Sequence, residues 1–193
     1  MIKIQHTKMQ ATMQSTLVRA QYLDLNWCIK LNGYSTTRQI ALFFKMVRRL
    51  GDGWFWYAAM LLVWAYQGVG YSQQMLYLIL ALLCATTIYK ALKQKTLRPR
   101  PYQVHQAVVL GERPLDHFSF PSGHTLHAVT LCILLGYVMP VLLWVMLPFT
   151  LLVAASRVIL GLHYPSDVLA GALIGSGLAG IFLGMAVWLG IGL

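Results

Sequence analysis

Three short groups of polar residues interrupt the otherwise apolar second half of this 193-residue chain. The first runs from Lys93 to Pro101, the second is Pro121-Ser122-Gly123-His124, and the third runs from Ser156 to Asp167. They combine lysines and arginines, which bind phosphate well, with histidines, which titrate near neutral pH. This combination predicts a pocket that binds an anion and carries out nucleophilic or acid–base chemistry on it.

The anion-binding groups are expected to come from all three segments. Lys93, Arg100 and Arg157 supply three permanent positive charges. Ser122 and the backbone amide of Gly123 lie at the predicted start of a helix, where unpaired amides and the helix dipole favour negative charge.

The reactive groups are expected to be two histidines beside these donors. Asp167 follows His163 by four residues and would hold one nitrogen of its ring, which leaves the other nitrogen free and more basic. His124 is the second titratable group. A structural alternative is that Asp167 only stabilises the start of the last helix, with Ser166 as the cap residue.

The remaining polar residues of this half have structural interpretations. Lys95 and Arg98 are typical of anchors at a membrane interface, and the Ser156 hydroxyl is expected to bond within its own helix. A metal site needs three or four converging ligands, and the spacing supports none. We therefore expect no metal and no cofactor, and we place three further histidines in loops or at the periphery: His105, His117 and His127.

The composition predicts that lipid surrounds most of the chain. Only 10% of the residues are charged, against about 25% in an average soluble chain, and 58% are hydrophobic. These values exclude a disordered chain, a coiled coil and an ordinary cytosolic enzyme. The formal net charge is +10, but the basic residues flank the apolar stretches and no nucleic-acid recognition motif accompanies them. We therefore expect membrane lipids, not nucleic acid, as the surroundings, and no obligate protein partner.

Five uncharged stretches predict an all-α integral membrane protein built as a bundle of about five transmembrane helices. Pro140 divides the long stretch 125–156 into two helices, and glycines at four- and five-residue spacings in the last stretch would let helix backbones approach closely. The expected spans are 53–70, 72–89, 125–138, 140–156 and 168–193.

Residues 1–52 have a different pattern, so we divide the chain into an N-terminal segment (1–52) and a transmembrane domain (53–193) with an active-site loop (93–123). Apolar residues recur at helical spacing from Val18 to Ile29 and from Ile40 to Val47, with a turn at Asn32-Gly33. This pattern predicts two amphipathic helices lying in the membrane interface. The alternative is one span over 17–50, and no signal peptide is evident.

An up-and-down bundle would bring the three polar groups to one face of the membrane, and their residues resemble the motifs of a known family. The chain is similar to the type-2 phosphatidic acid phosphatases, whose motifs are K-x6-RP, PSGH and SR-x5-H-x3-D. The matching residues are Lys93 with Arg100-Pro101, Pro121-Ser122-Gly123-His124, and Ser156-Arg157 with His163 and Asp167.

The resemblance implies a metal-independent phosphatase that works through a phosphohistidine. His163 would attack phosphorus while Asp167 orients it, and His124 would protonate the leaving oxygen and then activate water. The equatorial oxygens would be held by Lys93, Arg100, Arg157, Ser122 and the Gly123 amide.

The expected substrate is a lipid phosphate: a polyprenyl diphosphate, phosphatidylglycerol phosphate, phosphatidate or lipid A phosphate. Two other functions remain open, namely a non-catalytic lipid-phosphate binder or transporter and the vanadate-dependent haloperoxidase chemistry of the wider superfamily. The resemblance implies a multi-pass protein of the bacterial inner membrane with a periplasmic active site, although the basic N-terminal segment favours the cytoplasmic side.

Overall fold

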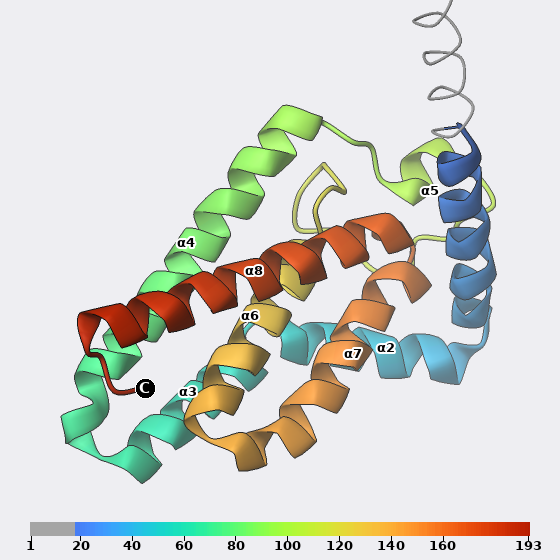
Figure 1. The fold of residues 1–193 in the computed structure, drawn as a ribbon. Helices are drawn as coiled ribbons and strands as arrows, with labels where there is room; N and C mark the ends of the chain where they lie inside the picture. The colour runs from blue at the N-terminus through green and yellow to red at the C-terminus, as the bar shows by residue number, and fades with distance from the viewer. Residues whose placement is uncertain (1–17) are drawn as a thin grey trace, which may run out of the picture.

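The computed structural model describes residues 18–193, and within them the regular structure is helical apart from one isolated bridge between Pro99 and Phe118. Residues 18–32 form the first helix (Figure 1). It is followed by η1 (Gly33–Thr36), α2 (Arg38–Gly51), α3 (Trp54–Gln67), η2 (Val69–Tyr71), α4 (Ser72–Thr96), α5 (Pro101–Val104), α6 (Gly123–Val138), η3 (Pro140–Leu142), α7 (Leu143–Ile159) and α8 (Pro165–Leu189).

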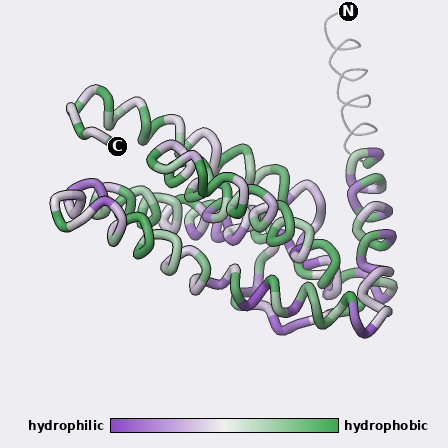
Figure 2. The backbone as a smooth tube through the Cα atoms, turned by 90° about the horizontal axis from the view of Figure 1, so that it is seen from below, coloured by the Kyte–Doolittle hydropathy of each residue, from purple (hydrophilic) through white to green (hydrophobic). Residues whose placement is uncertain are grey.

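Three segments of the described chain are long and apolar enough to cross a membrane, namely Val69–Thr96, Pro140–Ile159 and Pro165–Leu189. Their outer surfaces carry large apolar side chains that no protein covers, such as Trp144, Leu173 and Trp188. Figure 2 shows the helical bundle largely in green and white, whereas the helix next to the grey trace alternates purple and green. The chain is therefore a helical membrane protein.

The two other predicted spans form shorter helices. The span expected at 53–70 is α3 with 14 residues, and α6 has 16 residues. At about 1.5 Å per residue, each is shorter than the roughly 30 Å hydrocarbon core. The break predicted near 138–140 is confirmed, because α6 ends at Val138 and η3 begins at Pro140.

Helix α6 forms the centre of the bundle and contacts α3, α4, α7 and α8. Ten of its 16 residues are buried. Two of the glycines expected to allow close approach do so, because a Cβ would lie 2.6 Å from the Ser122 carbonyl oxygen at Gly171 and 2.6 Å from that of Leu126 at Gly175. Gly180 and Gly184 have open space around them.

The N-terminal segment bends where the sequence predicted a turn. The helix of residues 18–32 and α2 run at a steep angle to each other (Figure 1), so the alternative of one continuous span over 17–50 is wrong. The buried Asn32 side chain holds the bend, donating to the carbonyls of Val109 and Ile159 at 2.9 Å each and accepting from the Val109 amide at 2.8 Å. Residues 1–17 of the predicted segment lie outside the described residues.

One predicted boundary is wrong. The polar connection was expected to begin at residue 93, but α4 continues to Thr96 and ends at Leu97 with a φ of 48°. Residues 90–96 include three lysines and a glutamine, which end the uncharged stretch, but most of these residues are good helix formers, so the helix continues beyond the apolar stretch. Lys93 therefore lies on the last turn of α4. The end of α4, the start of α6 and the connection between α7 and α8 meet at one end of the bundle.

Candidate active site

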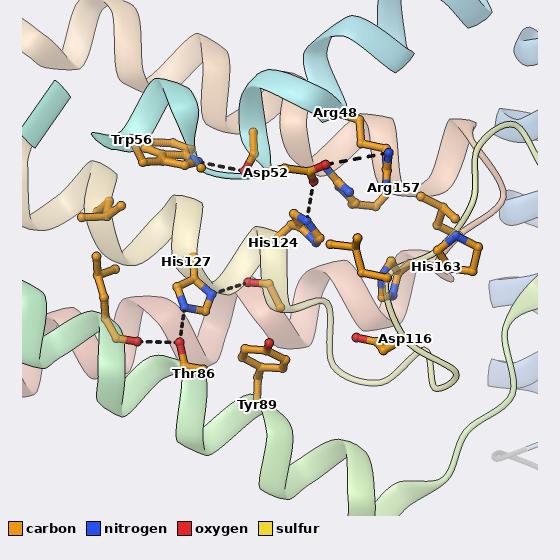
Figure 3. Close-up of a pocket in the computed structure, with 18 of the residues that line it drawn as sticks. Arg48, Asp52, Trp56, Thr86, Tyr89, Asp116, His124, His127, Arg157 and His163 are labelled. Atoms are coloured by element: carbon orange, nitrogen blue, oxygen red, sulfur yellow. Dashed lines mark hydrogen bonds and ion pairs between the residues drawn. The ribbon is translucent and has the colours of Figure 1, made fainter. Parts of the chain in front are cut away.

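A cavity of about 590 Å³ lies at this end of the bundle (Figure 3). One part of its wall is charged or titratable and includes Arg48, Asp52, Lys93, Arg100, Asp116, His124, Arg157 and His163. The other part is mainly apolar and comes from α3, α4 and α6, with Trp56, Tyr57, Met60, Ile79, Leu82, Leu83 and Leu131. The cavity therefore suits a ligand with an anionic head and an apolar tail.

Six of the eight predicted site residues line the cavity, namely Lys93, Arg100, Gly123, His124, Arg157 and His163. The other two, Ser122 and Asp167, are fully buried behind the wall. The Ser122 hydroxyl contacts the Thr125 hydroxyl at 2.9 Å, and the Ser122 amide donates to the Asp167 carbonyl at 3.0 Å. Ser122 thus joins the start of α6 to the start of α8, and its hydroxyl is not among the cavity-lining groups.

Arg157 is a buried cation with free donors. Arg157 is 1% exposed, and its Nε and Nη2 atoms have no hydrogen-bond partner within residues 18–193. Its carbonyl accepts hydrogen bonds from the amides of Leu162 and His163, both at 3.0 Å. The turn includes Gly161 at a φ of +70°, where a Cβ would lie 2.6 Å from the Val109 carbonyl oxygen. A buried guanidinium with unused donors favours an anionic ligand.

His163 lies between a carboxylate and a guanidinium. Its Nδ1 atom is 3.6 Å from Oδ2 of Asp167, and its Nε2 atom is 3.5 Å from Nη1 of Arg100. Burial lowers the pKa of His163 to about 4, and the positive charge of Arg100 acts in the same direction, whereas Asp167 opposes it. The ring is therefore neutral at pH 7, the form that a nitrogen nucleophile requires.

Asp167 both caps α8 and holds charged partners. Tyr164 is the N-cap residue, and its amide donates to Oδ2 of Asp167 at 2.9 Å, so the prediction of Ser166 as the cap is wrong. Oδ1 of Asp167 accepts from Arg98 Nη1 at 2.7 Å. Capping and contact with His163 are therefore combined in one carboxylate: Oδ2 accepts from the Tyr164 amide and lies 3.6 Å from Nδ1 of His163, while Oδ1 pairs with Arg98.

The sequence pattern predicts that Arg98 is an interfacial anchor, but in the structure its side chain forms ion pairs within the protein. Its guanidinium donates to Asp167 through Nη1 and to Asp24 through Nη2, each at 2.7 Å. Asp24 belongs to the helix of residues 18–32 and also accepts from the Ser166 amide at 2.9 Å. The sequence held one signal for this ion pair, namely the scarcity of acidic residues. With only five carboxylates among fifteen basic residues, each carboxylate is a strong candidate for a specific ion pair.

Asp116 is a second residue that the sequence analysis missed. Lys93 Nζ donates to its two oxygens at 2.8 and 2.7 Å, and Arg100 Nη2 donates to Oδ1 at 2.6 Å. Burial disfavours the carboxylate, but the hydrogen bonds and charges of Lys93 and Arg100 outweigh burial and lower the pKa of Asp116 below its ordinary value. The Asp116 carboxylate thus forms ion pairs with Lys93 and Arg100, two of the cations expected to bind the ligand.

The other polar residues have structural environments. Ser156 donates to the Val153 carbonyl at 2.6 Å, within its own helix as expected. His127 lines the cavity from α6, but its ring nitrogens contact the Gly123 carbonyl at 2.8 Å and the Thr86 hydroxyl at 2.9 Å. His105 and His117 lie between α5 and α6. Over the described part of the chain, no group of three or more His, Cys, Asp or Glu side chains is placed to hold a metal ion.

The structure is that of a helical membrane protein in which two histidines, His124 and His163, and several buried cations surround one cavity. Sequence comparison identifies the family to which such a protein belongs. Residues 74–190 match the family model of the PAP2 superfamily. Because the match covers more than half of the chain, the protein belongs to the PAP2 superfamily.

Individual relatives agree with this family. An undecaprenyl-diphosphatase of Sulfolobus acidocaldarius is 34% identical over 101 residues, 51% of this chain and 48% of that protein. The undecaprenyl-diphosphatase BcrC of Bacillus subtilis is 29% identical over 119 residues, 61% of each chain. The chain thus spans about half the length of the curated relatives it matches. The crystal structure of Aquifex aeolicus LpxE superposes with a TM-score of 0.70 at 27% identity, covering 84% of this chain and 95% of that one.

Proposed function

We propose that the protein is a lipid phosphate phosphatase, and that a polyprenyl diphosphate is the first substrate to test. The observation that carries the proposal is Arg157, a buried cation with two donor atoms that have no partner among residues 18–193, on a cavity whose other part is mainly apolar. The names of the relatives from Sulfolobus acidocaldarius and Bacillus subtilis favour the diphosphate. Phosphatidylglycerol phosphate, phosphatidate and lipid A phosphate are the remaining candidates.

The reaction that this site supports has two steps. Neutral His163 attacks phosphorus through Nε2, and Asp167 behind Nδ1 stabilises the positive charge that develops on the ring. His124 gives a proton to the leaving oxygen and then takes one from the water that cleaves the phosphohistidine. Lys93, Arg100 and Arg157, together with the Gly123 amide at the start of α6, stabilise charge on the phosphoryl oxygens.

The apolar part of the cavity would take the beginning of the lipid tail. Trp56 and Met60 of α3 face this part together with Ile79 and Leu83 of α4. Because both helices also expose apolar side chains, the tail can remain in lipid while the headgroup enters the charged part. The substrate therefore does not have to leave the bilayer.

We further propose that α3, α4, α6, α7 and α8 all cross the bacterial inner membrane, and that the helix of residues 18–32 and α2 lie in the interface beside the transmembrane domain 53–193. The active site then faces the periplasm, as the family resemblance implies. The positive-inside tendency opposes this orientation, but Arg48, Lys93, Arg100 and Arg157 are buried in the site and do not act as surface charges.

The test is phosphate release by the purified protein in detergent with excess chelator, using prenyl diphosphate, phosphatidylglycerol phosphate and phosphatidate. We expect turnover that survives the chelator and falls by several orders of magnitude in His163→Ala. His117→Ala, a change at an exposed loop histidine that does not line the cavity, is the matched control and should retain activity.

A radiolabelled phosphohistidine, trapped by acid quench and absent from His163→Ala, would separate the enzyme from a lipid-phosphate binder. Binding of these lipids without any phosphate release would contradict the proposal and support the non-catalytic alternative.

A further inference from the structure

Asp52 contacts His124 in the wall of the cavity and belongs to a part of the chain that the family model does not match. It follows α2, 72 residues before His124 and outside residues 74–190. Nε2–H of His124 donates to Oδ1 of Asp52 at 2.7 Å, and Oδ2 lies 3.8 Å from Arg48 Nη1 (Figure 3). The two side chains are 22% and 26% exposed, so they meet at the edge of the cavity and not in bulk water.

This contact determines which nitrogen of His124 remains available. Since Nε2 is occupied by Asp52, only Nδ1 is left for the cavity that His124 lines. His163 has a looser counterpart in Asp167, whose Oδ2 lies 3.6 Å from Nδ1 of His163, beyond hydrogen-bond distance, and leaves Nε2 for the cavity. Two histidine–carboxylate pairs therefore lie at one cavity: His163 and Asp167 are four residues apart, whereas Asp52 and His124 are 72 residues apart.

We propose that Asp52 is the positioning residue of the acid–base histidine, holding His124 in one tautomer and stabilising its imidazolium form. This inference rests on the proposed phosphatase activity. In the first step, Nε2 of His163 bonds to phosphorus as the bond between phosphorus and the leaving oxygen breaks, and this oxygen takes the electron pair of the broken bond and a proton from Nδ1 of His124. In the second step, Nδ1 takes a proton from water as the water oxygen bonds to phosphorus and the P–N bond electrons return to His163.

The carboxylate is suited to this role because it stays ionised. Burial disfavours the charge, but the hydrogen bond from His124 and the positive charges of Arg48 and Arg157 lower the pKa of Asp52 below its ordinary value. Loss of an oriented carboxylate behind a catalytic histidine exposes the wrong tautomer to the substrate. A purely structural role for Asp52 would instead be to tie the α2–α3 connection to α6.

Asp52→Asn tests this role with p-nitrophenyl phosphate, whose leaving group departs without a proton. We expect the first turnover, which releases p-nitrophenol and phosphorylates His163, to keep its rate within a few-fold. Steady-state turnover, which needs His124 to activate water, should fall by about 10²-fold. The variant should therefore show a burst of p-nitrophenol equal to the enzyme concentration and accumulate phosphohistidine.

Three comparisons make the result specific. In a His124→Ala background, Asp52→Asn should cost no further activity, because Asp52 acts through His124. Asp52→Ser, a second uncharged variant, should show the same ratio of burst to steady-state rate, and this ratio does not depend on the fraction of folded protein. Glu112→Gln removes a carboxylate that lies outside the cavity lining and should leave both rates unchanged.

An equal fall in burst and steady-state rates in Asp52→Asn and Asp52→Ser, or no fall in either, would overturn the role of Asp52 while leaving the phosphatase proposal intact. A wild-type protein without turnover on p-nitrophenyl phosphate and on every lipid tested would overturn both.

Discussion

At the residue scale, Asp116 takes the place that an anionic ligand would occupy. Its carboxylate accepts hydrogen bonds from Lys93 and Arg100, the two cations that the first sequence motif contributes to the cavity. The side chain is 40% exposed and belongs to the connection between α5 and α6, so a bound phosphate has to compete with it or displace it.

Asp116→Asn should therefore strengthen inhibition by inorganic phosphate. Removing the competing charge is expected to lower the inhibition constant about 3- to 10-fold, equivalent to ~1 kcal/mol for a partly exposed pair. The measurement is inhibition of phosphate ester hydrolysis at several phosphate concentrations, with Glu112→Gln as the control. Weaker phosphate binding in Asp116→Asn would mean that the carboxylate orders the two cations and does not compete with the ligand.

The Arg98 side chain connects the helix of residues 18–32 to the active site, because it pairs with both Asp24 and Asp167. Arg98→Ala would leave buried Asp167 without its charged donor, and loss of one partner of a buried pair costs a few kcal/mol, roughly 3 by the usual range. We expect a lower melting temperature and at least tenfold lower kcat, because Asp167 faces His163. Lys95→Ala removes a neighbouring exposed cation on α4 and should change neither quantity; equal effects of the two variants would argue against this role.

His163 also makes stability depend on pH. Its pKa is about 4 in the folded protein, against about 6.5 for an unperturbed histidine. Between these values the unfolded chain binds the proton and the folded protein does not, so stability is lost as the pH falls from about 6.5 to about 4, by up to ~3 kcal/mol. Thermal unfolding in detergent should show this fall in the wild type and a smaller one in His163→Gln. Parallel curves would contradict the assignment.

At the scale of elements, the approach of α8 to α6 brings the second and third motifs together. Gly171 faces the Ser122 carbonyl directly, and the Ser122 amide donates to the Asp167 carbonyl one turn earlier on α8. A side chain at residue 171 would push the start of α6 away from the residues around His163.

Gly171→Ala should lower stability by about 1–3 kcal/mol, as expected for overpacking, and should reduce activity because Gly123 and His124 move with the start of α6. Gly180→Ala is the matched control on the same helix, since nothing lies within 4 Å of its added Cβ. It should be neutral or stabilising by up to about 1 kcal/mol, because alanine has the higher helix propensity. Similar melting temperatures for the two variants would contradict the close approach.

At the scale of the whole molecule, the position of the active-site end relative to the membrane can be tested with cysteines. Gln106 is exposed in the connection between α5 and α6, and Val141 is 65% exposed at the opposite end of the bundle. The native Cys28 and Cys132 are buried and Cys84 is half-buried, which keeps the background low.

A periplasmic active site predicts that an impermeant thiol reagent labels Gln106→Cys in intact cells, whereas Val141→Cys reacts only after the cells are permeabilised. The wild type gives the background. The reverse pattern would place the site at the cytoplasmic face and would overturn the proposed orientation.

The sequence by itself determined the membrane class, the family and the approximate positions of most long helices. Few charges, long apolar stretches and a proline near residue 140 are local properties, and the helices they predict follow from them. The spacing of the three motifs at helix ends likewise predicted that Lys93, His124 and His163 would meet, and they line one cavity.

Only the tertiary structure decided which carboxylate accompanies which cation or histidine. Asp24 pairs with Arg98 across 74 residues, Asp52 with His124 across 72, and Asp116 with Lys93 across 23. The energy of an ion pair depends on the distance in space and on the burial of both groups, not on separation along the chain. Those distances exist only once α2, the helix of residues 18–32 and the connection between α5 and α6 have packed against the bundle.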